Sequence, residues 1–234
     1  MDKKLLQDYA RLIAVKGIAA SKGDEIWLYA GLDQPDFVIQ VVEECYKAGA
    51  KYVRVMYSDD RLTKLAYKYM KTSDLAKIPP YKMGEFKYMA KKYPSRLFLE
   101  SDDPNALKGI NQSKLAKVSS KTGLKIKPFR NAIEGKHKWC IAGVPSVAWA
   151  KSVFPNDSDE VAVEKLWDAI LKTSRVDGND PVENWNIHNQ NVHNHCQKLD
   201  NLNLKYLARC SYIGNGIDHA VENTKVIVVL PTFV

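Results

Sequence analysis

The sequence lacks the short motifs by which several large enzyme classes are recognised. No GxGxxG follows the first expected strand, which argues against a dinucleotide-binding fold. The chain also has no GxxxxGK[ST] phosphate-binding loop and no GxSxG nucleophile elbow. Nucleotide binding and serine-hydrolase chemistry are therefore not supported by motif.

Cysteine is scarce and long apolar runs are absent. The four cysteines, Cys45, Cys140, Cys196 and Cys210, form no CxxC pair, which favours reduced thiols in a cytosolic protein. Cys140 falls in an expected strand, where a buried, inert thiol is favoured over a reactive one. No apolar run approaches the roughly 20 residues that span a bilayer. The charged start, MDKKLLQDYA, lacks the apolar core of a signal peptide. We therefore expect a cytoplasmic protein with no membrane partner.

Acidic residues are almost missing from residues 104–138. Nine lysines and arginines accompany one acid, Glu134, so this basic segment carries 9 − 1 = +8, as much as the net charge of the whole chain. Such a segment could attract nucleic acid or an acidic surface. Lysine greatly outnumbers arginine, however, and nucleic-acid binders favour arginine. A solvated lysine-rich exterior is the preferred interpretation, and a nucleic-acid partner is not expected.

What the chain does have is an alternation of helical and strand-like segments. Apolar spacing, caps and breaks predict helices over 5–20, 35–48, 59–70, 81–92 and 111–122, and strands over 25–31, 50–58, 96–101 and 138–144. This alternation is typical of an α/β protein with an open, mostly parallel sheet and helices on both faces. Beyond Pro155 we expect helices over 158–176 and 182–199, then strands over 204–212 and 225–230. The predicted organisation is an α/β domain over 1–178, followed over 179–234 by a linking helix and the first strands of an incomplete second domain.

The stretch HNQNVHNHC (188–196) raises the question of a metal site. At about 100° per residue on a helix, His193 lies about 140° round from His188, so His188, His193 and His195 cannot converge on one ion. The i, i+4 ligand pair typical of zinc on a helix is missing, as is a carboxylate between 184 and 197. A polar helix face is favoured for the histidines and Cys196, with a structural role for His188.

Two acids adjoin at Asp59-Asp60, at an expected helix start. Carboxylates there satisfy free backbone N–H groups and interact favourably with the helix dipole, so capping is favoured over catalysis.

Five stretches, in order, carry a resemblance to a known family. They are LLQDYARLIAVKGIAASKGDEIWLYAG, AGAKYVRVMYSDDRL, KWCIAGVPSVAWAKSVFP, EKLWDAILKTSRVDGNDPVENWNIHN and LNLKYLARCSYIGNGID. Together they resemble the thermophilic-type metallo-aminopeptidases, the family of aminopeptidase T, aminopeptidase S and PepS. The resemblance covers about residues 5–220, and the SRVD…DP…W..HN block is its closest part. His188 and Asn189 fall inside that block, whereas His193, His195 and Cys196 fall where the family varies.

The resemblance implies a two-domain enzyme in which two divalent metal ions, zinc or cobalt, polarise the scissile carbonyl and generate the nucleophile. The family's Glu, His, Asp and Tyr ligands lie beyond the segment matched by GNGID, and no residue of this chain maps onto one. His219 and Glu222 are not family ligands, and a turn or strand edge is favoured for them. We therefore expect no catalytic or metal-binding residue here, and a homodimer as the assembly.

The last residues, VIVVLPTFV, form the most apolar run of the chain, which suggests a domain cut short or a sheet completed elsewhere. The preferred hypothesis is an N-terminal domain or truncated form of a metal-dependent aminopeptidase, inactive by itself. One alternative is an active aminopeptidase with a rearranged site built from His188, His193, His195 or His219. The other is a non-catalytic binding module that uses the basic segment 104–138.

Overall fold

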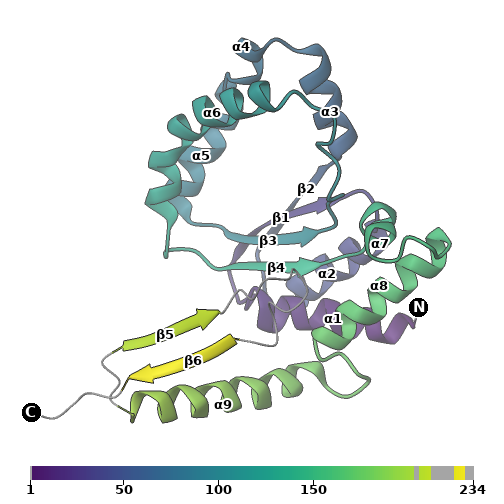
Figure 1. Ribbon diagram of the computed structural model, residues 1–234, viewed down its shortest axis with the longest axis vertical. Coiled ribbons are helices and arrows are strands. Elements are labelled where there is room, and N and C mark those ends of the chain that lie inside the picture. Colours follow the sequence, from purple (N-terminus) through teal and green to yellow (C-terminus); the bar gives the residue numbers. More distant parts are fainter. Residues whose placement is uncertain (1, 203–205, 212–223, 230–234) are drawn as a thin grey trace, which may run out of the picture. The chain divides into compact units, whose positions relative to one another are not determined.

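The computed structural model describes residues 2–202, 206–211 and 224–229, the last two ranges as backbone only (Figure 1). The chain divides into two compact units, residues 1–182 and 183–234. The predicted boundary after residue 178 stays a prediction.

The first unit is built on a four-stranded parallel sheet. Its strands are β1 (Glu25–Gly31), β2 (Tyr52–Ser58), β3 (Ser95–Glu100) and β4 (Trp139–Gly143), in the order β2-β1-β3-β4. From β1 the chain moves to β2 on one side, and from β3 it moves to β4 on the other. The strand order thus reverses between β1 and β3, which is where open α/β sheets form a crevice at the carboxyl ends of their strands.

One face of the sheet is covered by helices that bury a continuous core. These helices are α1 (Lys3–Leu12), α2 (Pro35–Lys47) and α8 (Asp159–Thr173). One aromatic side chain from each joins them, because Tyr9 stacks on Phe37 at 5.5 Å between ring centroids and Trp167 meets both rings edge-on. Strand residues of this face such as Leu28 and Leu97 are fully buried, as parallel sheets require.

The opposite face is covered only in part. The helices on this side are α3 (Asp60–Tyr69), α4 (Thr72–Leu75), α5 (Pro80–Lys92) and α6 (Gln112–Ile133), which arch over the sheet in Figure 1. Met89 and Ile133 pack on Trp27 of β1. On the edge strand β4, Trp139 and Ile141 remain 63% and 58% exposed. The fold class is confirmed as α/β, with an open parallel sheet and helices on both faces.

The structure corrects the predicted end of one helix. A helix over 111–122 was expected, but α6 continues to Ile133, through Gly123 and Pro128. Its second half is held from outside the helix, because Phe129 stacks on Phe86 of α5 at 6.2 Å and Ile133 is buried. Tertiary packing thus overrides two residues of low helix propensity. The expected strands and the other helices lie within a few residues of their predicted bounds, and α4 and the short α7 (Val147–Val153) were not predicted.

The second unit begins within α9 (Pro181–Asp200), the helix that carries the histidine-rich stretch. Strands β5 (Tyr206–Ser211) and β6 (Thr224–Val229) form an antiparallel pair, with Tyr206 opposite Val229. Among the described residues, no helix combines the length and apolar character that crossing a bilayer demands.

Candidate functional site

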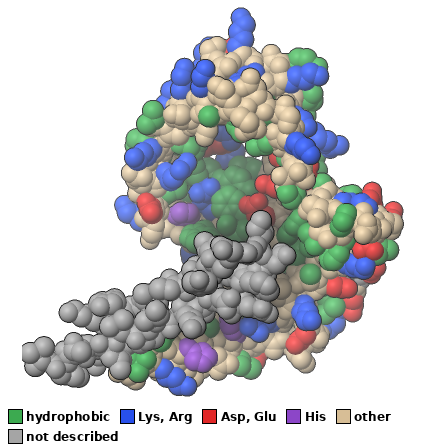
Figure 2. Space-filling model, viewed as in Figure 1, with side chains coloured by type: hydrophobic (Ala, Val, Ile, Leu, Met, Phe, Trp, Pro, Cys, Tyr) green, Lys and Arg blue, Asp and Glu red, His purple; other side chains and the backbone are tan. Residues whose placement is uncertain are grey.

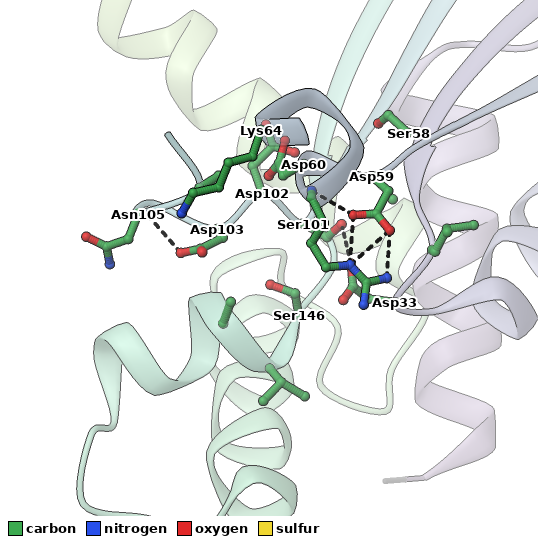
Figure 3. Close-up of a pocket in the computed structure, with 16 residues that line it drawn as sticks. Asp33, Ser58, Asp59, Asp60, Lys64, Ser101, Asp102, Asp103, Asn105 and Ser146 are labelled. Atoms are coloured by element: carbon green, nitrogen blue, oxygen red, sulfur yellow. Dashed lines mark hydrogen bonds and ion pairs between the residues drawn. The ribbon is translucent and has the colours of Figure 1, made fainter. Parts of the chain in front are cut away.

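The sheet's reversal point carries a crevice of about 470 Å³. Each strand contributes the residues that follow its carboxyl end. The polar ones are Asp33 after β1, Ser58, Asp59 and Asp60 at the end of β2, Ser101, Asp102 and Asp103 after β3, and Ser146 after β4. Figure 3 shows these side chains gathered around one opening, with Lys64 reaching the side on which Asp103 and Asn105 lie.

The floor of the crevice is set by a close approach between β1 and the segment after β3. The buried Ser101 hydroxyl donates to the Asp33 carboxylate at 3.2 Å (Figure 3). A Cβ atom on Gly31 would lie 2.3 Å from Ser101 Oγ and 3.0 Å from Asp33 Oδ2. Glycine at the end of β1 is therefore what allows this hydrogen bond to form.

The start of α3 explains the adjoining acids. Asp59 caps the helix, because its Oδ1 accepts from the backbone N–H of Arg61 at 2.8 Å. The same carboxylate pairs with the Arg61 guanidinium, and this pairing lowers the pKa of Asp59. The prediction that this pair of acids serves as a cap is confirmed for Asp59. Both acids also line the crevice, which the sequence reasoning did not foresee.

Like charges oppose one another within the crevice. Burial raises the pKa of Asp60, and the neighbouring Asp102 carboxylate raises it further. The pKa of Glu100 is raised by the same two causes. Asp60 and Asp102 lie together in Figure 3. The lining holds five aspartates against Lys64 and Arg61, so its formal charge is −5 + 2 = −3, which favours a cationic ligand over an anionic one.

The acids of the crevice do not amount to a metal centre. Among the described residues, no group of three or more His, Cys, Asp or Glu side chains is placed to hold a metal ion. A two-metal hydrolase needs such convergent ligands for each ion. The described part of the chain thus does not fit the metal pair that the resemblance implies, and no hydrolytic step is derived from it.

The histidine-rich stretch lies along α9. His188 is half-buried and meets the Trp185 ring edge-on at 5.3 Å, which agrees with a structural role. His193 hydrogen-bonds Gln197, one turn along the helix, at 2.9 Å. His193, His195 and Cys196 are all exposed, as expected for a polar helix face. His219 and Glu222 lie outside the described residues.

The basic segment is partly used inside the fold. Lys114 donates to the backbone carbonyls of Tyr67 and Met70, at the end of α3. Lys125 donates to the carbonyl of Ala76, just past α4, at 3.1 Å. Lys138 pairs with Asp24 at 2.6 Å. The segment is therefore not a free cationic surface over its whole length.

Cys140 agrees with the prediction of an inert thiol. It is half-buried in β4, and burial raises its pKa to about 11, so it is protonated at neutral pH.

The sequence reasoning missed Asp33, Ser101, Asp102 and Asp103. Ser101 is the last residue of an expected strand, and the three aspartates follow an expected strand within two residues. The carboxyl ends of parallel strands meet at one edge of a sheet. Polar residues that follow successive strands were the available signal.

Comparisons with known proteins agree on the family that this chain resembles. The family model for thermophilic metalloproteases (M29) matches residues 2–225. Aminopeptidase AmpS of Bacillus subtilis (strain 168) is 32% identical over 218 residues, which are 93% of this chain and 52% of AmpS. Aminopeptidase PepS of Streptococcus thermophilus is 35% identical over 188 residues, 80% of this chain and 46% of PepS.

A solved structure extends the likeness to three dimensions. Wild-type AmpT from Thermus thermophilus superimposes with a TM-score of 0.78 at 28% identity, over 90% of this chain and 52% of AmpT. The chain therefore spans about half the length of the curated relatives that it matches.

Proposed function

We propose, from the premise that the chain belongs to the thermophilic metalloprotease (M29) family, that it forms the N-terminal α/β half of a metal-dependent aminopeptidase. The observation that carries the proposal is the continuous match to proteins named as aminopeptidases, in sequence over 93% of the chain for AmpS and in structure over 90% for AmpT. The whole enzyme would remove N-terminal residues from peptides in the cytoplasm, as a homodimer.

The residues present indicate which half of the whole enzyme would hold the metal ions. Two divalent ions, zinc or cobalt, would supply Lewis-acid activation of the scissile carbonyl and of water in the whole enzyme. The described residues of this chain provide no convergent ligand set for them. We therefore assign this half a scaffolding role beside the metal-binding half, and we expect the 234-residue chain to be inactive by itself.

The first test measures metal content and turnover of the purified chain. After incubation with zinc or cobalt and removal of unbound metal, we expect well below one ion per chain and no chelator-sensitive cleavage of a leucyl chromogenic amide. Chelator-sensitive cleavage by this chain alone would contradict the assignment and favour a rearranged site using His188, His193, His195 or His219.

The second test asks whether the chain can complete an enzyme. It is fused to the part of Bacillus subtilis AmpS that it does not match, and the same cleavage is measured. Chelator-sensitive turnover in the fusion, absent from either part alone, supports the proposal. A fusion that folds and binds metal but does not cleave any aminoacyl amide would count against it.

A further inference from the structure

A second cavity lies on the partly covered face of the sheet, away from the acidic crevice. It measures about 130 Å³ and lies between α5, the second half of α6 and β3. Its walls are mostly apolar, and the apolar side chains that form them are Phe86, Met89, Ile126, Phe129 and Ile133. Two arginines, Arg96 and Arg130, complete the lining. In Figure 2 hydrophobic side chains form the floor of the hollow on this face, with basic side chains beside them.

Arg96 lies over two aromatic rings, and no described acidic residue pairs with it. Its guanidinium lies 4.8 Å from the centroid of the Phe98 ring and 5.6 Å from that of Tyr29. Its Nε is buried, and no described residue accepts a hydrogen bond from it. A buried donor without an acceptor costs free energy, so an acceptor from outside the described residues, a water molecule or a ligand, would lower that cost.

Arg54, on the same face of the sheet, has the kind of acidic partner that no described residue provides for Arg96. Arg54 of β2 and Arg96 of β3 flank Trp27 in the sheet register. The Arg54 guanidinium also lies over an aromatic ring, that of Trp27 at 4.8 Å, but it pairs with Glu85. Neither Arg96 nor Arg130 has an acidic partner within 4 Å among the described residues, and no acid lines the cavity.

We propose that Arg96 and Arg130 form a binding site for a carboxylate that carries a small apolar body. The planar guanidinium presents paired N–H donors that match a carboxylate. The cavity is about the size of one that holds benzene, roughly 150 Å³, so a phenyl ring or a leucine-sized side chain fits its walls. A free apolar carboxylic acid and the C-terminal residue of a peptide share this chemistry. The proposal does not depend on the peptidase function.

The first experiment tests whether binding needs both the negative charge and the apolar group of the ligand. The ¹⁵N and ¹H resonances of the Arg96 Nε–H are followed by NMR while the full chain is titrated with phenylacetate, phenylacetamide or acetate. We expect saturable shifts with phenylacetate, and binding at least about tenfold weaker for the other two, since each lacks one half of the recognised group. Equal binding of phenylacetate and phenylacetamide, or no phenylacetate binding up to millimolar concentration, would overturn the proposal.

Variants then locate the site, with a matched control on the same face. Arg96→Met and Arg130→Met keep an apolar stem but remove the donors, and each should weaken phenylacetate binding at least about tenfold. Arg54→Met should leave it unchanged, and Glu85 keeps Lys82 as a partner in that variant. A loss as large in Arg54→Met as in Arg96→Met would refute the assignment. If Arg96→Met does not fold, Arg130→Met carries the test alone.

The source of the carboxylate is distinguished by peptides. N-acetyl-alanyl-phenylalanine with a free carboxylate is compared with its C-terminal amide and with phenylacetate. Tighter binding of the free-acid peptide than of phenylacetate identifies a peptide C-terminus as the occupant, and weaker binding identifies a free acid. Equal binding of the free-acid peptide and its amide would contradict a carboxylate site.

Discussion

Gly31 shows how one missing side chain shapes the acidic crevice. Gly31 is the last residue of β1, and its backbone lies against the Ser101 hydroxyl that donates a hydrogen bond to Asp33. Because the nearest neighbour is a buried hydroxyl rather than a flexible tip, a methyl group here must displace it. The polar floor of the crevice therefore depends on a residue with no functional group of its own.

We expect Gly31→Ala to lower the free energy of unfolding by about 1–3 kcal/mol, the usual cost of overpacking a buried site. Urea denaturation measures it. Gly84→Ala is the matched control, since Gly84 lies within α5 and a Cβ there meets nothing within 4 Å. That change should instead stabilise the chain by about 0.5–1 kcal/mol. If Gly31→Ala left the free energy of unfolding unchanged, the Ser101 side chain would be able to move aside without cost.

A second prediction at this scale concerns charge. Asp102 raises the pKa values of Asp60 and Glu100, so Asp102→Asn should lower both, as a carboxyl NMR titration would show. A raised folded-state pKa gives stability that is present at low pH and is lost as pH rises past the unfolded value. The variant should therefore gain stability over the parent between about pH 4 and 7.

Asp103→Asn is the control for the charge effect. Asp103 acts on Asp60 but is not among the causes of the Glu100 shift. The pKa of Glu100 should therefore not change in the Asp103→Asn variant. If Asp103→Asn lowered the pKa of Glu100 as much as Asp102→Asn does, the raised pKa of Glu100 would not come from Asp102.

At the scale of elements, lysines of α6 connect this helix to the ends of α3 and α4 by hydrogen bonds. A helix ends with unsatisfied carbonyls and a negative dipole, and cationic side chains satisfy both. Lys114 reaches the carbonyls at the end of α3, and Lys125 reaches the one just past α4. Part of the basic segment is thus structural, which the charge count alone could not reveal.

Lys114→Met should lower the free energy of unfolding by about 1–3 kcal/mol, because it leaves two carbonyls without their charged donor. Lys117→Met is the control, as Lys117 is exposed on the same helix, and surface changes of this kind stay within about 0.5 kcal/mol. Thermal or urea unfolding distinguishes them. Equal effects would show that Lys114 contributes only its charge to the surface.

At the scale of the whole molecule, the first unit has its own core. The aromatic cluster of Tyr9, Phe37 and Trp167 and the sheet face beneath it draw only on residues before 182. Arg11 also pairs with Asp180 inside this unit. The unit therefore contains the packing that cooperative folding requires.

A chain ending at Val182 should accordingly unfold in one cooperative transition, with a urea midpoint close to that of the full chain. Circular dichroism at 222 nm and tryptophan fluorescence should give coincident curves. Tryptophan is informative, since Trp27 and Trp167 are buried on opposite faces of the sheet. A broad transition, or two separate ones, would contradict the independence of this unit.

The sequence by itself determined most of the elements, the α/β class and the family, whereas α4, α7 and the second half of α6 were not predicted. Short apolar runs such as Glu25–Gly31 and cap signals such as Asp59 are local, so they can be read from neighbouring residues. Family resemblance, likewise, needs only the order of residues along the chain.

Only the tertiary structure decided where the sites lie. Asp33, Asp60 and Asp102 come from three separate segments, and Arg96 and Arg130 from a strand and a helix. Their meeting depends on strand order and on which faces the helices cover. The same holds for α6, whose second half exists because Phe129 and Ile133 find partners outside the helix. Interactions between distant segments are set by packing, which local patterns do not encode.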